Sequence, residues 1–163
     1  MAGFTTKTFL KYDDYGTPKS AWNDIKNFIP SESKIWSPFY LDGKQKEIFS
    51  ELGFDIYHEK KDFFEYEPED YNIIVDNPPF DLKKEIFTRL KELDKPFIII
   101  CPSSMINTVY FRDLFRNSKI QILIPRRRIQ FIKDGLETQN RCNFDCFYYC
   151  YKMNFDKDII FLD

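Results

Sequence analysis

The sequence contains no long apolar run, no leader-like start, only one histidine and no excess of basic residues. No stretch approaches the roughly 18 apolar residues that a transmembrane helix needs. The chain also lacks a basic and then apolar start that ends in a small-residue cleavage site, the pattern of a secretory signal. These absences argue against a membrane span and against secretion, so we expect a cytoplasmic protein.

The charge balance argues against a chain that binds polyanions over its whole surface. With 24 Lys and Arg against 26 Asp and Glu, the formal net charge is −2. Any contact with nucleic acid must therefore be local. The local candidate is Arg126, Arg127 and Arg128, with Lys133 and Arg141 in the polar segment that follows. A solvated strand end is the alternative interpretation of this cluster.

The cysteines do not predict a metal site. Cys142, Cys146 and Cys150 recur every fourth residue, whereas zinc ligands usually come as two separated pairs, often completed by histidine. The one histidine, His58, is far away in the sequence, and we expect it to be structural rather than a general base. The aromatic residues around these cysteines favour a strand in which cysteine is a small apolar filler. We expect no bound metal.

Length and composition predict one ordered domain. The chain has 163 residues, of which 43% are hydrophobic and 18% aromatic, enough to bury a continuous core. We expect a single domain over 1–163, with 1–12 as a flexible arm.

The order of apolar patterns predicts a three-layer α/β fold. Thr17 as a cap and Pro18 at the first helical position open a helix that Pro30 ends. Further helices are expected at 44–52, 82–93 and 110–116, and strands at 34–37, 54–59, 72–75, 96–101, 120–124, 129–132 and 145–152, followed by a short tail. This alternation predicts a Rossmann-like, mostly parallel sheet with an antiparallel C-terminal strand.

The stretch Asp76, Asn77, Pro78, Pro79, Phe80 follows the apolar strand 72–75 directly. Strand ends are where open α/β sheets keep their chemistry. Two prolines restrict the backbone, so Asn77 is held extended beside a carbonyl and an aromatic ring. The plainer interpretation is a Pro-Pro turn that only ends the strand.

This stretch resembles the Asn/Asp-Pro-Pro-aromatic motif of amino-methyltransferases that use S-adenosylmethionine, particularly adenine-N6 methyltransferases of phage and large-virus type. The resemblance covers roughly 15–151 and implies the class I methyltransferase fold. The segment 38–43 resembles the family's cofactor-binding turn, where many members have a second glycine besides the one at Gly43.

The resemblance implies a role for each matching residue. Glu59 would accept hydrogen bonds from the ribose hydroxyls of the cofactor, and Asp62 would accept one from its adenine amino group. Phe63 would pack on the adenine ring, and Asp42 would hold the methionine ammonium. The stretch Thr17, Pro18, Lys19 resembles the N-terminal motif that covers the cofactor from the other side. The alternative for 59–62 is a solvated loop, and the alternative for 15–19 is a plain helix start. The implied catalytic set is Asp76, Asn77, Pro78 and Phe80; the cofactor set is Thr17, Pro18, Pro38, Phe39, Asp42, Gly43, Glu59, Asp62, Phe63 and Asn77; the substrate set is Pro79, Phe80, Arg126, Arg127, Arg128 and Lys133.

The chemistry supports such a motif independently. An exocyclic amine on a nucleobase is a poor nucleophile because its lone pair is delocalised. The Asn77 side-chain oxygen and the Pro78 carbonyl can each accept one N–H and aim that lone pair at a methyl donor. Phe80 would stack on the base, which must be flipped out or single-stranded.

The expected substrate is therefore adenine in DNA or RNA. We expect no separate target-recognition domain, so recognition would come from short loops or from a partner subunit. A protein glutamine N-methyltransferase and a non-catalytic, methyltransferase-like partner subunit remain as alternatives.

Overall fold

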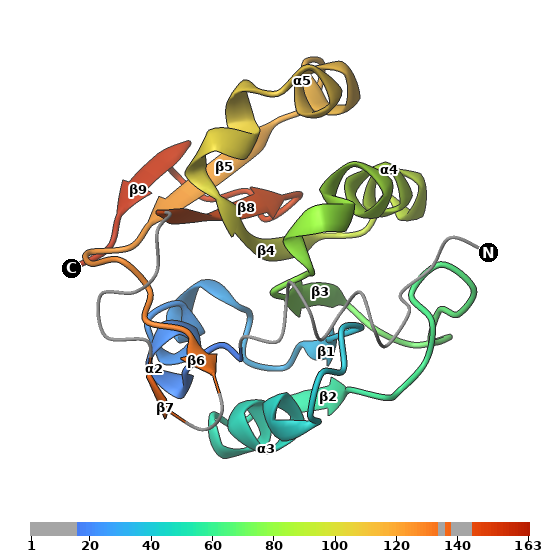
Figure 1. Ribbon diagram of the computed structural model, residues 1–163, viewed down its shortest axis with the longest axis vertical. Coiled ribbons are helices and arrows are strands. Elements are labelled where there is room, and N and C mark those ends of the chain that lie inside the picture. Colours follow the sequence, from blue (N-terminus) through green and yellow to red (C-terminus); the bar gives the residue numbers. More distant parts are fainter. Residues whose placement is uncertain (1–15, 134–135, 138–144) are drawn as a thin grey trace.

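The computed structural model describes residues 16–133, 136–137 and 145–163, arranged around one mixed sheet (Figure 1). The predicted arm, 1–12, lies outside this range. The sheet has seven strands, in the spatial order β2 (Asp55–Tyr57), β1 (Lys34–Trp36), β3 (Ile73–Asp76), β4 (Phe97–Pro102), β8 (Cys146–Tyr151), β5 (Ile120–Ile124) and β9 (Ile159–Phe161). Strand β8 is antiparallel to both of its neighbours, and the other adjacent pairs are parallel. The predicted Rossmann-like fold class is confirmed.

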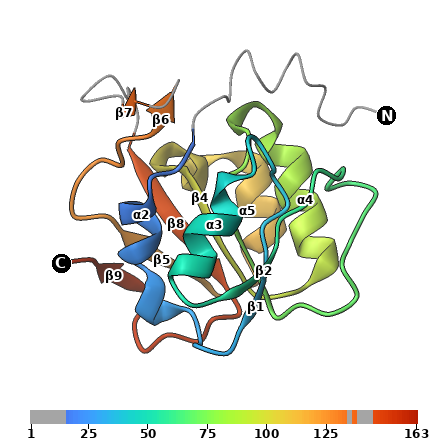
Figure 2. The ribbon, with the colours of Figure 1, turned by 90° about the horizontal axis from the view of Figure 1, so that it is seen from below.

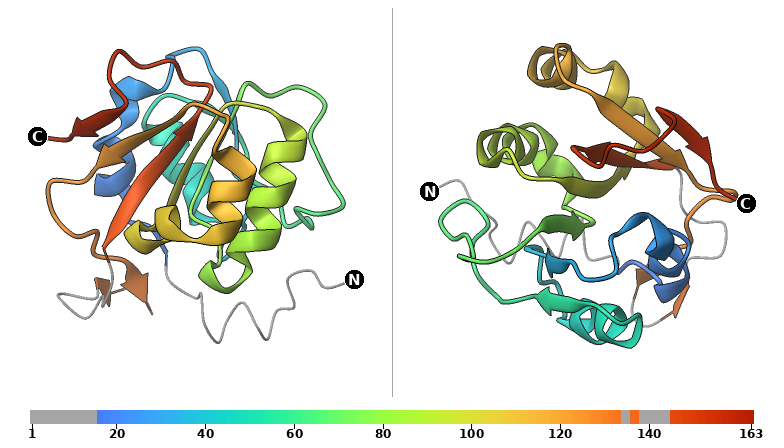
Figure 3. Two further views of the ribbon diagram at one scale, coloured as in Figure 1. Left: turned by 90° about the horizontal axis from the view of Figure 1, so that it is seen from above. Right: turned by 180° about the vertical axis from the view of Figure 1, so that it is seen from behind.

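Helices cover both faces of the sheet, which makes the domain three-layered (Figures 1 and 2). One face carries α2 (Lys19–Asn23) and α3 (Lys44–Glu51), and the other carries α4 (Lys83–Leu93) and α5 (Val109–Phe115). The two views in Figure 3 show α4 and α5 side by side on their face. Three short 3-10 turns complete the pattern: η1 (Lys26–Phe28), η2 (Phe80–Leu82) and η3 (Ser103–Asn107).

Strand β4 shows how the sequence divides the core. Ile98 and Ile100 pack toward α2 and α3, whereas Phe97, Ile99 and Cys101 pack toward α4 and α5. All five side chains are 0% exposed. Because successive strand residues face opposite sides of a sheet, a strand covered by helices on both faces is apolar throughout. The predicted strand at 96–101 is confirmed as β4.

The start of α2 differs from the prediction. The helix begins at Lys19, and Pro18 is its cap residue, with an extended backbone and no side-chain capping bond. Thr17 is not the cap, because its hydroxyl oxygen accepts a hydrogen bond from Asn77 instead. The helix also ends early, at Asn23, and continues as η1. The predicted end of α3 is confirmed, since Gly53 follows it with a φ of +96° that favours glycine.

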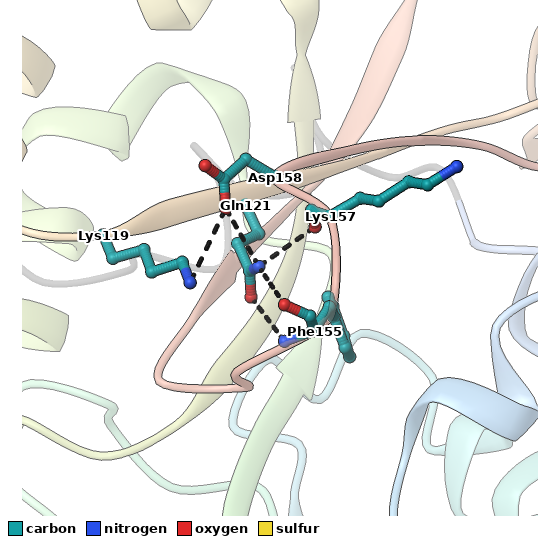
Figure 4. Close-up of polar contacts among 5 residues, drawn as sticks. All are labelled: Lys119, Gln121, Phe155, Lys157 and Asp158. Atoms are coloured by element: carbon teal, nitrogen blue, oxygen red, sulfur yellow. Dashed lines mark hydrogen bonds and ion pairs between the residues drawn. The ribbon is translucent and has the colours of Figure 1, made fainter.

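Strand β9 differs from the prediction of a short tail after 152. Its position depends on Gln121, a buried side chain of β5 that is 2% exposed. The Gln121 amide donates to the carbonyls of Phe155 and Lys157 and to Asp158, and its oxygen accepts from the Phe155 N–H (Figure 4). These bonds hold the turn before β9, so that β9 pairs with β5.

The segment after β5 also differs from the prediction. Residues 129–131 are not a strand; pairing begins at Ile132, in the two-residue strand β6 (Ile132–Lys133), which pairs with β7 (Leu136–Glu137). The predicted loop 133–141 thus contains a short hairpin, and 134–135 and 138–141 lie outside the described residues. Ile132 also bridges to Gly16. Within the described part of the chain, no helix has the length and apolarity needed to cross a membrane.

Candidate active site

The polar residues singled out in the sequence gather at one edge of the sheet. Strands β1, β2 and β3 are parallel, so their carboxyl ends lie at the same edge. Ser37 follows β1, His58 follows β2, and Asp76 is the last residue of β3. All three side chains are buried. The topology thus brings together residues that are about 20 positions apart in the sequence.

The Asp76 carboxylate joins two of the predicted turns. Its Oδ2 accepts from the backbone N–H of Phe39 at 2.6 Å, and its Oδ1 accepts from the backbone N–H of Asn77 at 2.7 Å. Oδ1 also accepts from the Gln45 side chain at 2.8 Å. With both oxygens engaged and only 1% of the residue exposed, Asp76 is placed to position the turns rather than to touch a substrate.

Burial dominates the electrostatics of this carboxylate. Removal from water raises the pKa of Asp76 from 3.8 to about 6. A positive charge on His58 and the hydrogen bonds from Phe39, Gln45 and Asn77 act in the opposite direction and lower that pKa. Desolvation therefore outweighs the three donors that favour the ionised form.

Asn77 is oriented by two bonds and leaves one acceptor unused. Its side-chain Nδ2 donates to the Thr17 hydroxyl oxygen at 2.9 Å, a contact between residues 60 positions apart. Its Oδ1 is buried and has no hydrogen-bond partner among the described residues. A buried acceptor without a partner costs roughly 1–3 kcal/mol. Such an atom at a strand end is suited to accept a hydrogen bond from a ligand.

Phe80 lies half-buried at the end of the Pro-Pro turn, with Pro78 and Pro79 buried before it. Its ring meets the ring of Phe131 edge-on, with 6.4 Å between the centroids. The Lys83 ammonium donates to the Phe80 carbonyl at 2.6 Å and lies 5.9 Å from the ring centroid. The Phe80 ring is thus held from two sides, by the segment after β5 and by the start of α4.

No pattern in the sequence indicates that 129–132 reaches this site. The Gly16 N–H donates to the Ile132 carbonyl at 2.7 Å, and the Ile132 N–H donates back at 2.8 Å. This pair ties the segment after β5 to the residue that precedes Thr17. Phe131 and Gly16 are therefore site residues that only the tertiary structure identifies.

The predicted cofactor turn, 38–43, is tightly built. Pro38 and Phe39 are buried, and Gly43 has a φ of +80°. A Cβ at Gly43 would lie 2.5 Å from the Tyr40 hydroxyl oxygen, so any other residue would displace the Tyr40 ring as well as strain the backbone. The Asp42 carboxylate accepts from the Lys44 N–H at 3.1 Å, and its side chain is 51% exposed.

His58 holds the same turn from the opposite side. Its Nδ1 lies 2.8 Å from the Ser37 carbonyl oxygen, and its Nε2 lies 3.1 Å from the Tyr40 carbonyl oxygen. A neutral ring donates to one of these oxygens and a protonated ring to both. The ring also stacks on Tyr40, with 5.0 Å between centroids. Both ring nitrogens face the backbone, which favours the predicted structural role.

Glu59 and Asp62 lie in the loop after β2. The Tyr66 hydroxyl donates to Glu59 at 3.1 Å, and Lys61 lies 3.3 Å from the same carboxylate, which is 41% exposed. Asp62 accepts from the Phe64 N–H at 2.8 Å in a tight local turn. Both carboxylates thus have local partners, and the Glu59 side chain keeps a substantial exposed fraction.

Phe63 lies deeper than the resemblance implies. It is 1% exposed and packs against Trp36 and Phe39, with centroids 5.6 and 5.1 Å away. In this arrangement the ring has no open face for a ligand and instead supports the turn at Phe39 from below.

The arginine cluster follows β5 at the same edge of the sheet. Arg126, Arg127 and Arg128 are all exposed. Arg128 pairs with Asp145, with 2.8 Å from Nε to Oδ1, and this bond lowers the pKa of the Asp145 carboxyl. Lys133 belongs to β6, and its side chain lies outside the described ones.

Comparison with known proteins supplies no family. The sequence matches no protein-family model and no curated protein. Among solved structures, a dimethyladenosine transferase from Plasmodium falciparum is similar over 84% of this chain and 62% of its own, with a TM-score of 0.49 and 10% identity. TrmN from Thermus thermophilus is similar over 82% of this chain and 47% of its own, with a TM-score of 0.38 and 11% identity. These likenesses concern the fold and assign no residue of the site.

The described residues contain no group of three or more His, Cys, Asp or Glu side chains arranged to hold a metal ion. Cys146 and Cys150 are buried in β8, and Cys142 lies outside the described residues.

Proposed function

We propose that this chain transfers a methyl group from S-adenosylmethionine to the exocyclic N6 of adenine in DNA or RNA. The observation that carries the proposal is the buried Asn77 Oδ1, which has no hydrogen-bond partner among the described residues. Because Nδ2 is bonded to Thr17, the amide presents its oxygen, and so an acceptor, at the end of β3.

An acceptor at this position suits an amine substrate. Asn77 Oδ1 would accept one N–H of the amino group, and the Pro78 carbonyl would accept the other. Two acceptors on one nitrogen draw it toward tetrahedral geometry and free its lone pair to attack. Phe80, held by Phe131 and Lys83, would stack on the base. Asp76 would not act as the base, because its oxygens are already engaged.

The turn at 38–43 fits the proposed cofactor in part. S-adenosylmethionine would supply an electrophilic sulfonium methyl group. The exposed Asp42 carboxylate can pair with its ammonium group, and the partly exposed Glu59 carboxylate can accept from its ribose hydroxyls. Asp62 keeps one carboxylate oxygen beyond its bond to Phe64. Phe63 supports this turn from the core.

The charge at the site edge favours a nucleic acid over a protein substrate. Arg126 and Arg127 are exposed after β5, at the edge of the sheet that also carries Asn77. Arginines can grip a phosphate backbone without reading its sequence. A protein glutamine would fit the same acceptors, but it would not need this cationic cluster. A partner subunit that supplies target recognition belongs to the proposal, because the basic surface is small.

Two measurements test the proposal. Calorimetry with S-adenosylmethionine tests binding of the donor, and transfer of labelled methyl to single-stranded DNA, duplex DNA, RNA and protein tests the substrate class. We expect binding, and label in adenine of a nucleic-acid pool. Absence of donor binding at millimolar concentration would overturn both catalytic interpretations, and label in protein would select the glutamine alternative.

Variants of Asn77 sharpen the test. Asn77→Ala removes the acceptor and should lower kcat by roughly a hundredfold or more, as removal of a transition-state hydrogen bond does. Asn77→Asp keeps an acceptor and loses the donor to Thr17, so it should retain more activity than Ala. Asn117→Ala, an exposed asparagine beyond α5, is the matched control.

A further inference from the structure

Four segments of the chain meet at the side chain of Gln45, in the first turn of α3. Its Nε2 donates to Asp76 Oδ1 at 2.8 Å and also to the Ser37 hydroxyl oxygen. Its Oε1 accepts from the indole N–H of Trp22 at 3.1 Å. Both N–H groups and the oxygen of one amide are therefore used, by residues from α2, from the end of β1 and from the end of β3.

This amide controls how the Asp76 carboxylate is turned. Asp76 Oδ1 receives two donors, Gln45 Nε2 and the Asn77 N–H, while Oδ2 receives only the Phe39 N–H. Hydrogen bonds at three points restrict the orientation of the carboxylate. This orientation places the backbone of Phe39 relative to the backbone of Asn77. Without the Gln45 donor, each oxygen keeps a single bond to a backbone N–H, and the orientation of the carboxylate is less restricted.

We propose that Gln45 is a positioning residue that acts through Asp76 to hold the cofactor turn and the catalytic turn in register. The names of the two turns, 38–43 and 76–80, rest on the proposed function, whereas the network itself does not. Gln45 touches neither the amine nor the methyl donor in this role. Its effect is transmitted through two backbone N–H groups.

The role has a signature in the titration of Asp76. The Asp76 carboxylate accepts from the uncharged Gln45 side chain of α3 and from the backbone of Phe39 and Asn77, and the titratable group that acts on it is His58 after β2. Donation from Gln45 lowers the pKa of Asp76, against the larger effect of burial. Removal of this donor must therefore shift the titration of Asp76 to higher pH.

Two substitutions remove the hydrogen bond from residue 45 to Asp76 while they keep the approximate size of the side chain. Gln45→Glu keeps the size and the acceptor for Trp22, but its ionised carboxylate cannot donate to Asp76 and adds a like charge that also raises the pKa of Asp76. Gln45→Met keeps the approximate volume and removes all three hydrogen bonds. Lys46→Met, an exposed neighbour on the same helix, is the control for the effect of methionine on α3. Thermal unfolding of each variant shows whether it is folded.

The experiment follows the backbone N–H resonances of Phe39 and Asn77 by NMR as a function of pH, and in parallel the pH dependence of kcat/KM for S-adenosylmethionine. In both Gln45 variants we expect the titration midpoint to move to higher pH. We expect kcat/KM to fall about tenfold or more, and its acid limb to move in the same direction. The Lys46→Met protein should behave as the wild type.

The outcomes distinguish the positioning role of Gln45 from the proposed methyl transfer. Unmoved midpoints in the folded Gln45 variants would overturn the positioning role, whether or not the wild type is active. Moved midpoints with unchanged kinetics, in a wild type that transfers methyl, would overturn it as well. A wild type that neither binds S-adenosylmethionine nor transfers methyl would overturn the proposed function alone, and the NMR titration would still decide the network.

Discussion

The burial of Asp76 makes a prediction about stability that does not depend on any ligand. Its pKa is raised from 3.8 to about 6 by desolvation, against the opposing effects of His58 and three hydrogen bonds. Between these two pH values the folded protein holds a proton that the unfolded chain has released. The stabilisation from protonated Asp76 is thus fully present below pH 3.8 and is lost as the pH rises through about 6.

The magnitude follows from the difference between the two pKa values. At about 1.4 kcal/mol per pKa unit, a rise of about two units corresponds to about 3 kcal/mol. Chemical denaturation of the wild type and of Asp76→Asn, from about pH 3 to about pH 8, gives the free energy of unfolding of each. The free energy of unfolding of the wild type minus that of the variant should fall by about 3 kcal/mol across this range. Titrations of the other groups cancel in this difference.

A second carboxylate supplies a control of opposite sign. A hydrogen bond from Lys152, followed by one from Tyr151, lowers the pKa of Asp94. The free energy of unfolding of the wild type minus that of Asp94→Asn should therefore rise as the pH increases to about 4 and stay level above it. Asparagine also tolerates the positive φ of 54° at this position. A difference for Asp76→Asn that is flat, or that rises with pH, would refute the conclusion that burial outweighs the donors.

Three further predictions concern the cofactor turn, the edge strand and the basic cluster. Gly43→Ala should destabilise the fold by about 1–2 kcal/mol, because position 43 has a positive φ and the added Cβ would meet the Tyr40 ring. Calorimetry should also show weaker binding of S-adenosylmethionine, and unchanged affinity would contradict the role of this turn in cofactor binding. Gln121→Leu should cost roughly 3 kcal/mol in denaturation and remove hydrogen-exchange protection from β9, and retained protection would show that β9 holds without the amide. The double change Arg126→Gln and Arg127→Gln should reduce the slope of log affinity for nucleic acid against log salt by about 1–2 without changing donor affinity, and an unchanged slope would place the phosphate contacts elsewhere.

Local patterns in the sequence were sufficient for most of the elements. The apolar runs at 72–75 and 96–101 predicted β3 and β4 because a strand covered on both faces is apolar throughout, whatever its partners are. The end of α3 was predictable for a similar reason, because the positive φ that favours glycine at position 53 is a local property of the backbone. The stretch 76–80 could be singled out because restriction by consecutive prolines is a property of the chain itself.

Other features depend on contacts between distant residues, which a local pattern does not encode. Thr17 has the residue type of a helix cap, and only the approach of Asn77, 60 positions later, shows that its hydroxyl is used elsewhere. Gln121 and β9 escaped prediction because a lone polar residue in an apolar strand has no meaning until its partners, 34 to 37 residues away, are known.

The residue types of the candidate site were thus determined by the sequence alone: an amide, two prolines and an aromatic ring at the end of a buried strand. Their working arrangement was decided by the tertiary structure. Parallel pairing of β1, β2 and β3 brings Ser37, His58 and Asp76 to one edge, where Gln45 can bond to Asp76. Hydrogen bonds and desolvation act over a few ångströms, so the fold must bring these groups together before any of them acquires its role.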